Sequence, residues 1–168
     1  MKCYDLLLIS VDSPVLIGIY SDKKLVKSIK KAGKFSDILP MLFDGIFKGD
    51  YLPKDVNLNG DSNVDSTRIA NIFYVNGPGN FSAIKLTHIF LQSIKIAKKI
   101  PLFCTDAFAF SQNEFINAYG KIHFCKKNDE IFTTNLSQKL PNAFALPNVL
   151  DSDIFSQHCE PLYILPAV

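Results

Sequence analysis

The sequence lacks the cysteine spacing of a zinc or redox motif. Its four cysteines lie far apart and form no Cys-x-x-Cys pair: Cys3, Cys104, Cys125 and Cys159. A zinc knuckle and a thioredoxin-like motif are therefore excluded, because both need closely spaced thiolates. We expect the four side chains to be buried, reduced thiols.

The chain also lacks a strong excess of charge and any long hydrophobic run. Its 18 basic and 16 acidic residues give a net charge of +2, which is too balanced to indicate a nucleic-acid-binding surface. No stretch reaches the roughly 18 apolar residues of a membrane span, and Met1-Lys2 is not followed by the apolar segment of a signal peptide. We therefore expect a cytoplasmic protein that does not contact a membrane.

Spacings typical of catalytic or metal sites are missing too. His88, His123 and His158 form no His-x-x-x-His or His-Glu-x-x-His pattern, so no metal site is predicted. No Ser-His-Asp arrangement can be nominated. Two carboxylates leave alternatives open. Asp12 either binds a metal or activates water, or it forms a turn, and Asp106 either faces a ligand at a strand end or caps a short helix.

Apolar surface is plentiful. Hydrophobic residues make up 48% of the 168 residues, and 14 residues are phenylalanine. This is enough for one folded domain with a core, and it leaves apolar area over for a partner.

A local lysine cluster is either a solvated strand edge or a phosphate-binding surface: Lys23, Lys24, Lys27, Lys30, Lys31 and Lys34.

Hydrophobic periodicity predicts an α/β fold. Three short strands, at residues 6–10, 14–20 and 25–29, form an antiparallel meander. A helix at Ile38–Lys48 follows, with Ser36 or Asp37 as its cap and Gly49 at its end. After a polar connector at residues 51–68, the chain has a strand at 72–75, a second helix at 82–98 and a strand at 100–104. This strand-helix-strand unit predicts a right-handed parallel crossover.

The last third of the chain predicts smaller elements. They are a short helix at 106–110, a hairpin around Gly120, a strand at 131–134 and a short strand at 162–164. Both long helices are apolar on more than one side, so we expect each of them to contact two neighbours.

The most distinctive stretch is the turn between the strand at 72–75 and the second helix. Gly77 and Gly79 allow backbone angles that other residues avoid, Pro78 fixes one φ, and Asn80 or Ser82 can cap the helix. Such a turn either holds an anion on free N–H groups or simply reverses the chain. It lacks the Lys-Ser/Thr ending of a P-loop and the full Gly-x-Gly-x-x-Gly spacing.

These motifs resemble the TsaB family, bacterial proteins that assist threonylcarbamoyl transfer to an adenosine of tRNA. In that family a strand ends in Gly-Pro-Gly-Ser-Phe-Thr-Gly-Leu-Arg. Four of these residues are identical here, namely Gly77, Pro78, Gly79 and Phe81, and the others are replaced by Asn80, Ser82, Ala83, Ile84 and Lys85. Residues 35–40 resemble the family's His-Ser-x-x-Leu-x-Pro, residues 100–102 its Gly-Ile-Pro-Leu, and residues 160–163 its closing Pro-x-Tyr-Leu-Arg.

The chain departs from the family at charged positions. Ser10-Val11-Asp12 stands where the family has Asp-Thr-Ser, so the carboxylate at the strand end is displaced or missing. Residues 116–123 lose the charges of the family's Asp-Ala-Arg-Arg-Gly-Glu-Val-Tyr, and Leu165 replaces its closing arginine. Ligand roles tied to these charges are not carried over.

The resemblance implies an actin-like ATPase, ribonuclease-H-like α/β fold with a reduced second lobe. Residues 1–105 then form the main lobe with two interface helices, and residues 106–168 form the second lobe and tail. It also implies a non-catalytic subunit that binds the paralogue TsaD through both helices and has no cofactor of its own. ATP and metal then belong to TsaD, and tRNA is bound through the complex.

TsaE is a further candidate partner, and a homodimer is expected in isolation. Our candidate contacts lie on the two helices, although the sequence does not decide which face is outward: Leu39, Leu42, Phe43, Phe47, Ile84, Thr87, Leu91 and Ile94. The sequence leaves open whether TsaE or the ATP of the partner contacts the turn at Gly77–Lys85. Two alternatives stay open: an actin-like ATPase or metallopeptidase acting alone, and direct tRNA binding by the lysine-rich strand.

Overall fold

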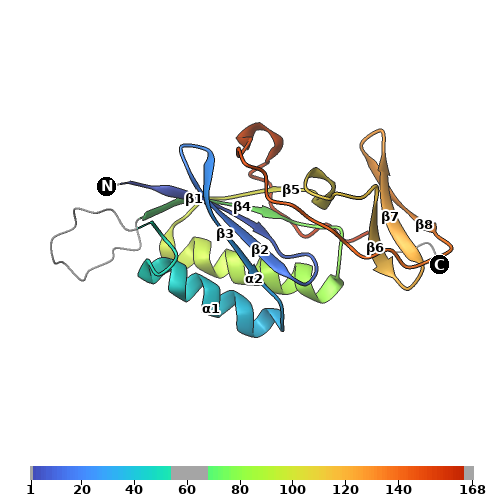
Figure 1. Ribbon diagram of the computed structural model, residues 1–168, viewed down its shortest axis with the longest axis horizontal. Coiled ribbons are helices and arrows are strands. Elements are labelled where there is room, and N and C mark those ends of the chain that lie inside the picture. The colour runs from blue at the N-terminus through green and yellow to red at the C-terminus, as the bar shows by residue number, and fades with distance from the viewer. Residues whose placement is uncertain (1, 54–67, 165–168) are drawn as a thin grey trace.

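The computed structural model describes residues 2–53 and 68–164, and it contains a five-stranded mixed sheet in the order β3-β2-β1-β4-β5 (Figure 1). Its strands are β1 (Tyr4–Ile9), β2 (Val15–Ser21), β3 (Lys24–Lys31), β4 (Ile69–Val75) and β5 (Leu102–Thr105). The first three strands are antiparallel, which confirms the expected meander. Strand β4 is parallel to β1, and β5 is parallel to β4, as expected for the crossover. Most of the predicted polar connector, residues 54–67, lies outside the described residues.

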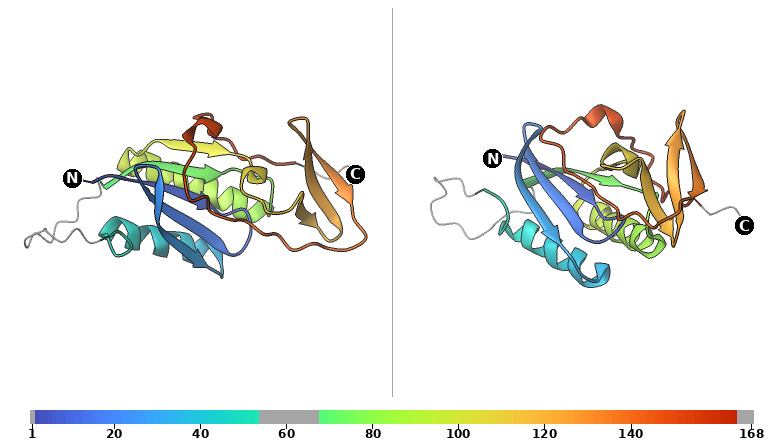
Figure 2. Two further views of the ribbon diagram at one scale, coloured as in Figure 1. Left: turned by 45° about the horizontal axis from the view of Figure 1, so that its top comes forward. Right: turned by 45° about the vertical axis from the view of Figure 1, so that its right-hand side comes forward.

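Two helices, α1 (Phe35–Lys48) and α2 (Phe81–Lys98), lie side by side on one face of this sheet (Figures 1 and 2). Helix α1 begins earlier than predicted. Its N-cap is Lys34, which makes no side-chain cap, so the predicted capping by Ser36 or Asp37 is wrong. Asp37 lies instead in the first turn, where a negative charge complements the helix dipole. Gly49 ends the helix in the left-handed conformation, at φ 84°, as predicted.

The core has two layers because both faces of the sheet are covered. On one face Leu6, Leu8, Ile17 and Tyr74 pack against α1 and α2. On the other face Leu7 and other alternate residues of the strands pack against the last third of the chain. This alternation is the two-residue period of a strand that is buried on both sides.

The last third of the chain begins with a 3₁₀ turn, η2 (Ala107–Ala109). Asp106 caps this turn, which is one of the two roles predicted for Asp106. A second, antiparallel sheet follows, formed by β6 (Phe115–Tyr119), β7 (Ile122–Lys127) and β8 (Glu130–Asn135). It lies beside one end of the first sheet (Figure 2). The predicted hairpin around Gly120 and the strand at 131–134 are therefore confirmed.

After β8 the chain returns across the first sheet. The N–H of Leu25 donates to Asn148 O at 2.9 Å, and a second 3₁₀ turn, η3 (Ser152–Ile154), follows. Residues 155–164, which we name the C-terminal strap, then run beside β5 and the turn before α2. The predicted strand at 162–164 is wrong, because Leu162 makes a single backbone bond to Asn76 O instead of a ladder.

Within the described residues, no helix is both long and apolar enough to cross a membrane. The division of the chain at residue 105 stays a prediction. The return of the strap to β5 means that residues from beyond this point also complete the first lobe.

Candidate functional site

Close packing on both sides explains the two glycines of the turn between β4 and α2. Gly77 has φ 130°, and a Cβ built on it would lie 2.5 Å from the carbonyl O of Leu162 in the strap. A Cβ on Gly79 would lie 2.7 Å from the Cβ and carbonyl O of Val11. Larger residues would therefore push away the strap on one side and the β1–β2 connection on the other.

Several backbone groups around this turn are paired within the chain. The N–H of Asn80 donates to Val11 O at 2.7 Å, and its side chain accepts the N–H of Ala83 at 3.1 Å, so Asn80 caps α2. The carbonyl of Gly77 accepts the N–H of Ala107 at 2.8 Å. These bonds favour the interpretation of the turn as a chain reversal over that of an anion site. Ser82 and Lys85 are exposed at the start of α2.

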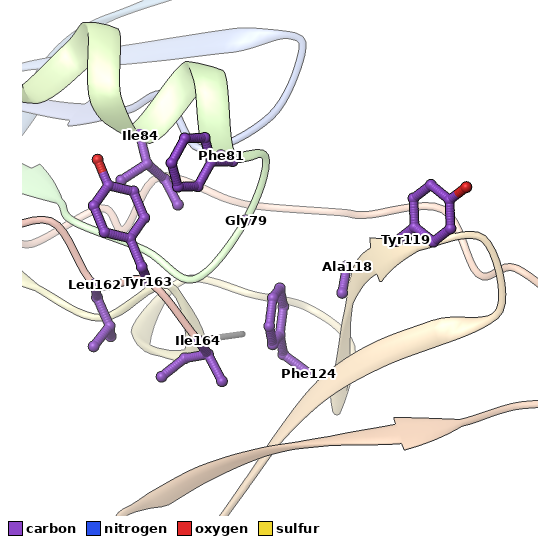
Figure 3. Close-up of a pocket in the computed structure, with 9 residues that line it drawn as sticks. All are labelled: Gly79, Phe81, Ile84, Ala118, Tyr119, Phe124, Leu162, Tyr163 and Ile164. Carbon is purple, nitrogen blue, oxygen red and sulfur yellow. The ribbon is translucent and has the colours of Figure 1, made fainter. Parts of the chain in front are cut away.

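An apolar pocket of about 170 Å³ lies between the start of α2, the strap and the second sheet (Figure 3). Phe81 and Ile84 come from α2, and Phe124 faces them from β7. The rings of Phe81 and Tyr163 lie 4.6 Å apart between centroids, although Phe81 is still 56% exposed. The pocket is thus an aromatic-walled junction between the two lobes.

A more polar cleft of about 550 Å³ adjoins this pocket and shares Ala118 and Tyr119 with it. It contains Asp12, whose Oδ1 accepts the N–H of Ser13 and whose Oδ2 accepts the Asn142 amide at 2.7 Å. Asp12 therefore acts as the turn former that one prediction expected. Within residues 2–53 and 68–164 no group of three or more His, Cys, Asp or Glu side chains could hold a metal ion.

The other polar candidates also have structural partners. Asp106 forms an ion pair with Lys126 at 2.7 Å in addition to its capping role. The buried His123 accepts the N–H of Leu140 on Nε2, so its Nδ1–H donates to Lys121 O at 2.8 Å. His88 lies 3.3 Å from Tyr74 Oη, and burial lowers the pKa of His88. Four of the six clustered lysines, Lys24, Lys27, Lys30 and Lys31, lie on β3, an edge strand of the sheet, as one of the two predicted roles of the cluster requires.

The predicted partner contacts on the two helices lie mostly inside this chain. Six of the eight are buried, namely Leu39, Leu42, Phe43, Ile84, Thr87 and Leu91, while Phe47 and Ile94 are partly buried against the same core. Thr87 makes a buried bond between its Oγ1 and Ser10 Oγ at 2.9 Å, which ties α2 to the end of β1. The candidate contact residues therefore lie on the inward faces of the two helices. The sequence alone did not decide which face of each helix is inward and which is outward. Contact of these residues with a partner stays a prediction.

The outward apolar surface consists of other residues. A groove of about 260 Å³ runs between α1 and α2, lined by Phe35, Ser36, Leu39, Pro40, Leu86, Ile89, Phe90 and Ser93. Leu86 is 41% exposed and Ile89 is 54% exposed, and Met41 and Ile96 are exposed beyond the groove. The outer face of α1 carries both apolar and charged residues, because the exposed Asp44 and Lys48 form an ion pair there. The small or polar Ala83 and Thr87 mark the inward side of α2, and this signal could have identified Leu86 and Ile89 as outward.

This chain is similar to known proteins in its three-dimensional structure. No family model matches the sequence, and no curated protein matches it. Among solved structures, YeaZ from Pseudomonas aeruginosa is similar, with a TM-score of 0.50 and 14% identity over 80% of this chain. An uncharacterised P. aeruginosa protein, described as similar to the peptidase YeaZ, has a TM-score of 0.49 at 14% identity, over 80% of this chain and 64% of its own.

The match covers 65% of the YeaZ chain, so this chain spans slightly less than two thirds of that protein. YeaZ is a TsaB protein, and its structure has the actin-like, ribonuclease-H-like fold. The fold class expected from the sequence is therefore confirmed, and the resemblance to TsaB is confirmed at the level of the fold.

Proposed function

We propose that this chain is a TsaB-type accessory subunit, which binds TsaD and supports tRNA threonylcarbamoyladenosine formation without a catalytic site of its own. The observation that carries the proposal is the apolar groove between α1 and α2, on the sheet's helix-covered side. Leu86 and Ile89 are large apolar residues that the rest of the chain leaves about half exposed. The YeaZ-like fold supports the same proposal.

TsaD is the proposed occupant because a paralogue of the same fold offers two equivalent helices. Two helices from each protein form a four-helix bundle, which buries about 1,200–2,000 Å² in total for a stable pair. Leu86 and Ile89 then occupy the centre of the bundle, with Met41 and Ile96 beside them. Without TsaD, a second copy of this chain covers the same surface, so a homodimer is the expected isolated state. ATP and the metal ion are then bound by TsaD, and TsaE is a further candidate partner.

The test is a binding measurement with purified TsaD of the same organism. Wild-type protein, Ile89→Asp and Val149→Asp are compared by isothermal titration calorimetry and gel filtration. Val149 is a matched control because it is 60% exposed and apolar but belongs to the returning chain after β8. Burying an uncompensated charge at the centre of an interface costs several kcal/mol, so Ile89→Asp should weaken binding by roughly a hundredfold or more.

Three outcomes would contradict the proposal. They are no binding by the wild type, equal binding by Ile89→Asp and the wild type, and equal weakening by both variants. Circular dichroism of each variant verifies that the fold is retained, which is expected because both positions are exposed. ATP or peptide hydrolysis by the purified chain alone, lost on substitution of Asp12 or Asp106, would favour the enzyme alternative instead.

A further inference from the structure

Two cysteines that are far apart in the sequence meet where the C-terminal strap passes β5. The N–H of Cys104 donates to Ser156 O at 2.9 Å, and the N–H of Ser156 donates to Cys104 O at 2.8 Å. Cys159 follows three residues later. The Cys104 Sγ lies 3.5 Å from His158 O, and the Cys159 Sγ lies 3.4 Å from Ser156 O, the same carbonyl that accepts the Cys104 N–H. The backbone bridge and these two contacts therefore bring both thiols to residues 156–158 of the strap.

The surroundings make the two thiols chemically different. Cys104 is 4% exposed, whereas Cys159 is only partly buried. The neighbouring Cys104 and Tyr74 side chains, together with the charge of Lys95, lower the pKa of Cys159 in spite of its burial. Interaction with the Cys159 side chain, together with burial, raises the pKa of Cys104. Cys159 is therefore the accessible thiol that ionises first, and Cys104 is the protonated neighbour behind it.

We propose that Cys159 and Cys104 form a hydroperoxide-sensitive dithiol, whose disulfide fastens the C-terminal strap to β5. The Cys159 thiolate attacks one oxygen of the hydroperoxide. A sulfur–oxygen bond forms, the oxygen–oxygen bond breaks, and the leaving oxygen takes a proton from water. Cys104 then attacks the sulfenic sulfur, so that a disulfide forms and the hydroxide leaves as water with the Cys104 proton. Two thiols are oxidised and one hydroperoxide is reduced.

Formation of the Cys104–Cys159 disulfide would restrain the apolar pocket, because the C-terminal strap forms one of the walls of this pocket. Leu162 donates its N–H to Asn76 O at 2.8 Å next to the turn, and Tyr163 packs on Phe81. A disulfide three residues before Leu162 restrains this wall against β5. The inference is independent of TsaD binding, since the groove between α1 and α2 contains neither cysteine.

The experiment uses a Cys3→Ser/Cys125→Ala protein, which retains only the proposed pair. It is treated with hydrogen peroxide, its free thiols are counted after denaturation, and its peptides are mapped by mass spectrometry. We expect both thiols to be lost, a Cys104–Cys159 cross-linked peptide to appear, and dithiothreitol to restore both thiols. The closed loop is long, so the oxidised form should melt roughly 5–10 °C higher than the reduced form.

Single variants separate the roles of the two cysteines. In a Cys104→Ser background, dimedone should label Cys159 as sulfenic acid, because the resolving thiol is missing. In a Cys159→Ser background, Cys104 should stay unmodified at the same peroxide concentration. Two free thiols after peroxide treatment, a cross-link between two chains in place of the internal one, or dimedone labelling of Cys104 in preference to Cys159 would overturn the proposal.

Discussion

Truncation of two leucines of α2 tests the orientation of this helix, on which the location of the proposed docking surface depends. Leu91 is fully buried against the sheet, whereas Leu86 is 41% exposed in the outer groove. Leu91→Ala removes about three carbon groups from the core, worth about 2.4 kcal/mol at 0.8 kcal/mol each. The cavity that is left raises the loss to about 3–4 kcal/mol. Leu86→Ala should cost less than about 1 kcal/mol, because much of this side chain is already in water.

Urea unfolding followed by circular dichroism measures the difference. With a slope of about 2 kcal/mol per molar urea, Leu91→Ala should lower the midpoint by about 1.5–2 M, and Leu86→Ala by less than about 0.5 M. Leu91→Met, which nearly conserves volume, should lie close to the wild type and serves as a control. If Leu86→Ala costs as much as Leu91→Ala at an unchanged slope, α2 is rotated differently and the outer groove is not a free surface.

Two further predictions concern the turn and the response to pH. A Cβ at Gly79 would lie 2.7 Å from Val11, so Gly79→Ala should cost about 1–3 kcal/mol and lower the melting temperature. Gly120→Asn, at a left-handed residue where an added Cβ would meet no atom within 4 Å, should leave this temperature nearly unchanged. Burial lowers the pKa of His88 below 6.5, so the unfolded chain takes up this proton first as the pH falls. Its contribution to stability is full above pH 6.5 and is lost below it. The melting temperature of His88→Gln should therefore fall less between about pH 7.5 and pH 5 than that of the wild type, and equal falls would refute this role.

The elements of the first lobe could be predicted because each has a strong local signal. The apolar run at Ile72–Val75, the glycines of the turn and the long apolar pattern of α2 have short-range causes. The predicted start of α1 is wrong because Ser36 and Asp37 are good caps only in isolation. Packing of Phe35 against the core extends the helix past them instead.

The C-terminal strap and its contacts could not be predicted, because they depend on segments that are distant in the sequence. Nothing near Cys159 indicates that Cys104 lies beside it. Two of the four cysteines also differ from the expected burial, since Cys3 is exposed and Cys159 is only partly buried. Such pairings arise from the path of the returning chain, and short-range patterns contain no information about that path.

The outward face of α2 was the least predictable part of the candidate site, because this helix has more than one kind of neighbour along its length. Its first turn contacts the strap and the second sheet, its middle contacts β1, and α1 lies along its side. The apolar residues therefore spread around the helix instead of forming one stripe. The Thr87–Ser10 bond and the fully buried Ala83 lie on the inward side of the helix, and Leu86 and Ile89 are exposed on its outward side. The proposed docking surface thus lies opposite a buried polar contact, which a count of apolar residues cannot reveal.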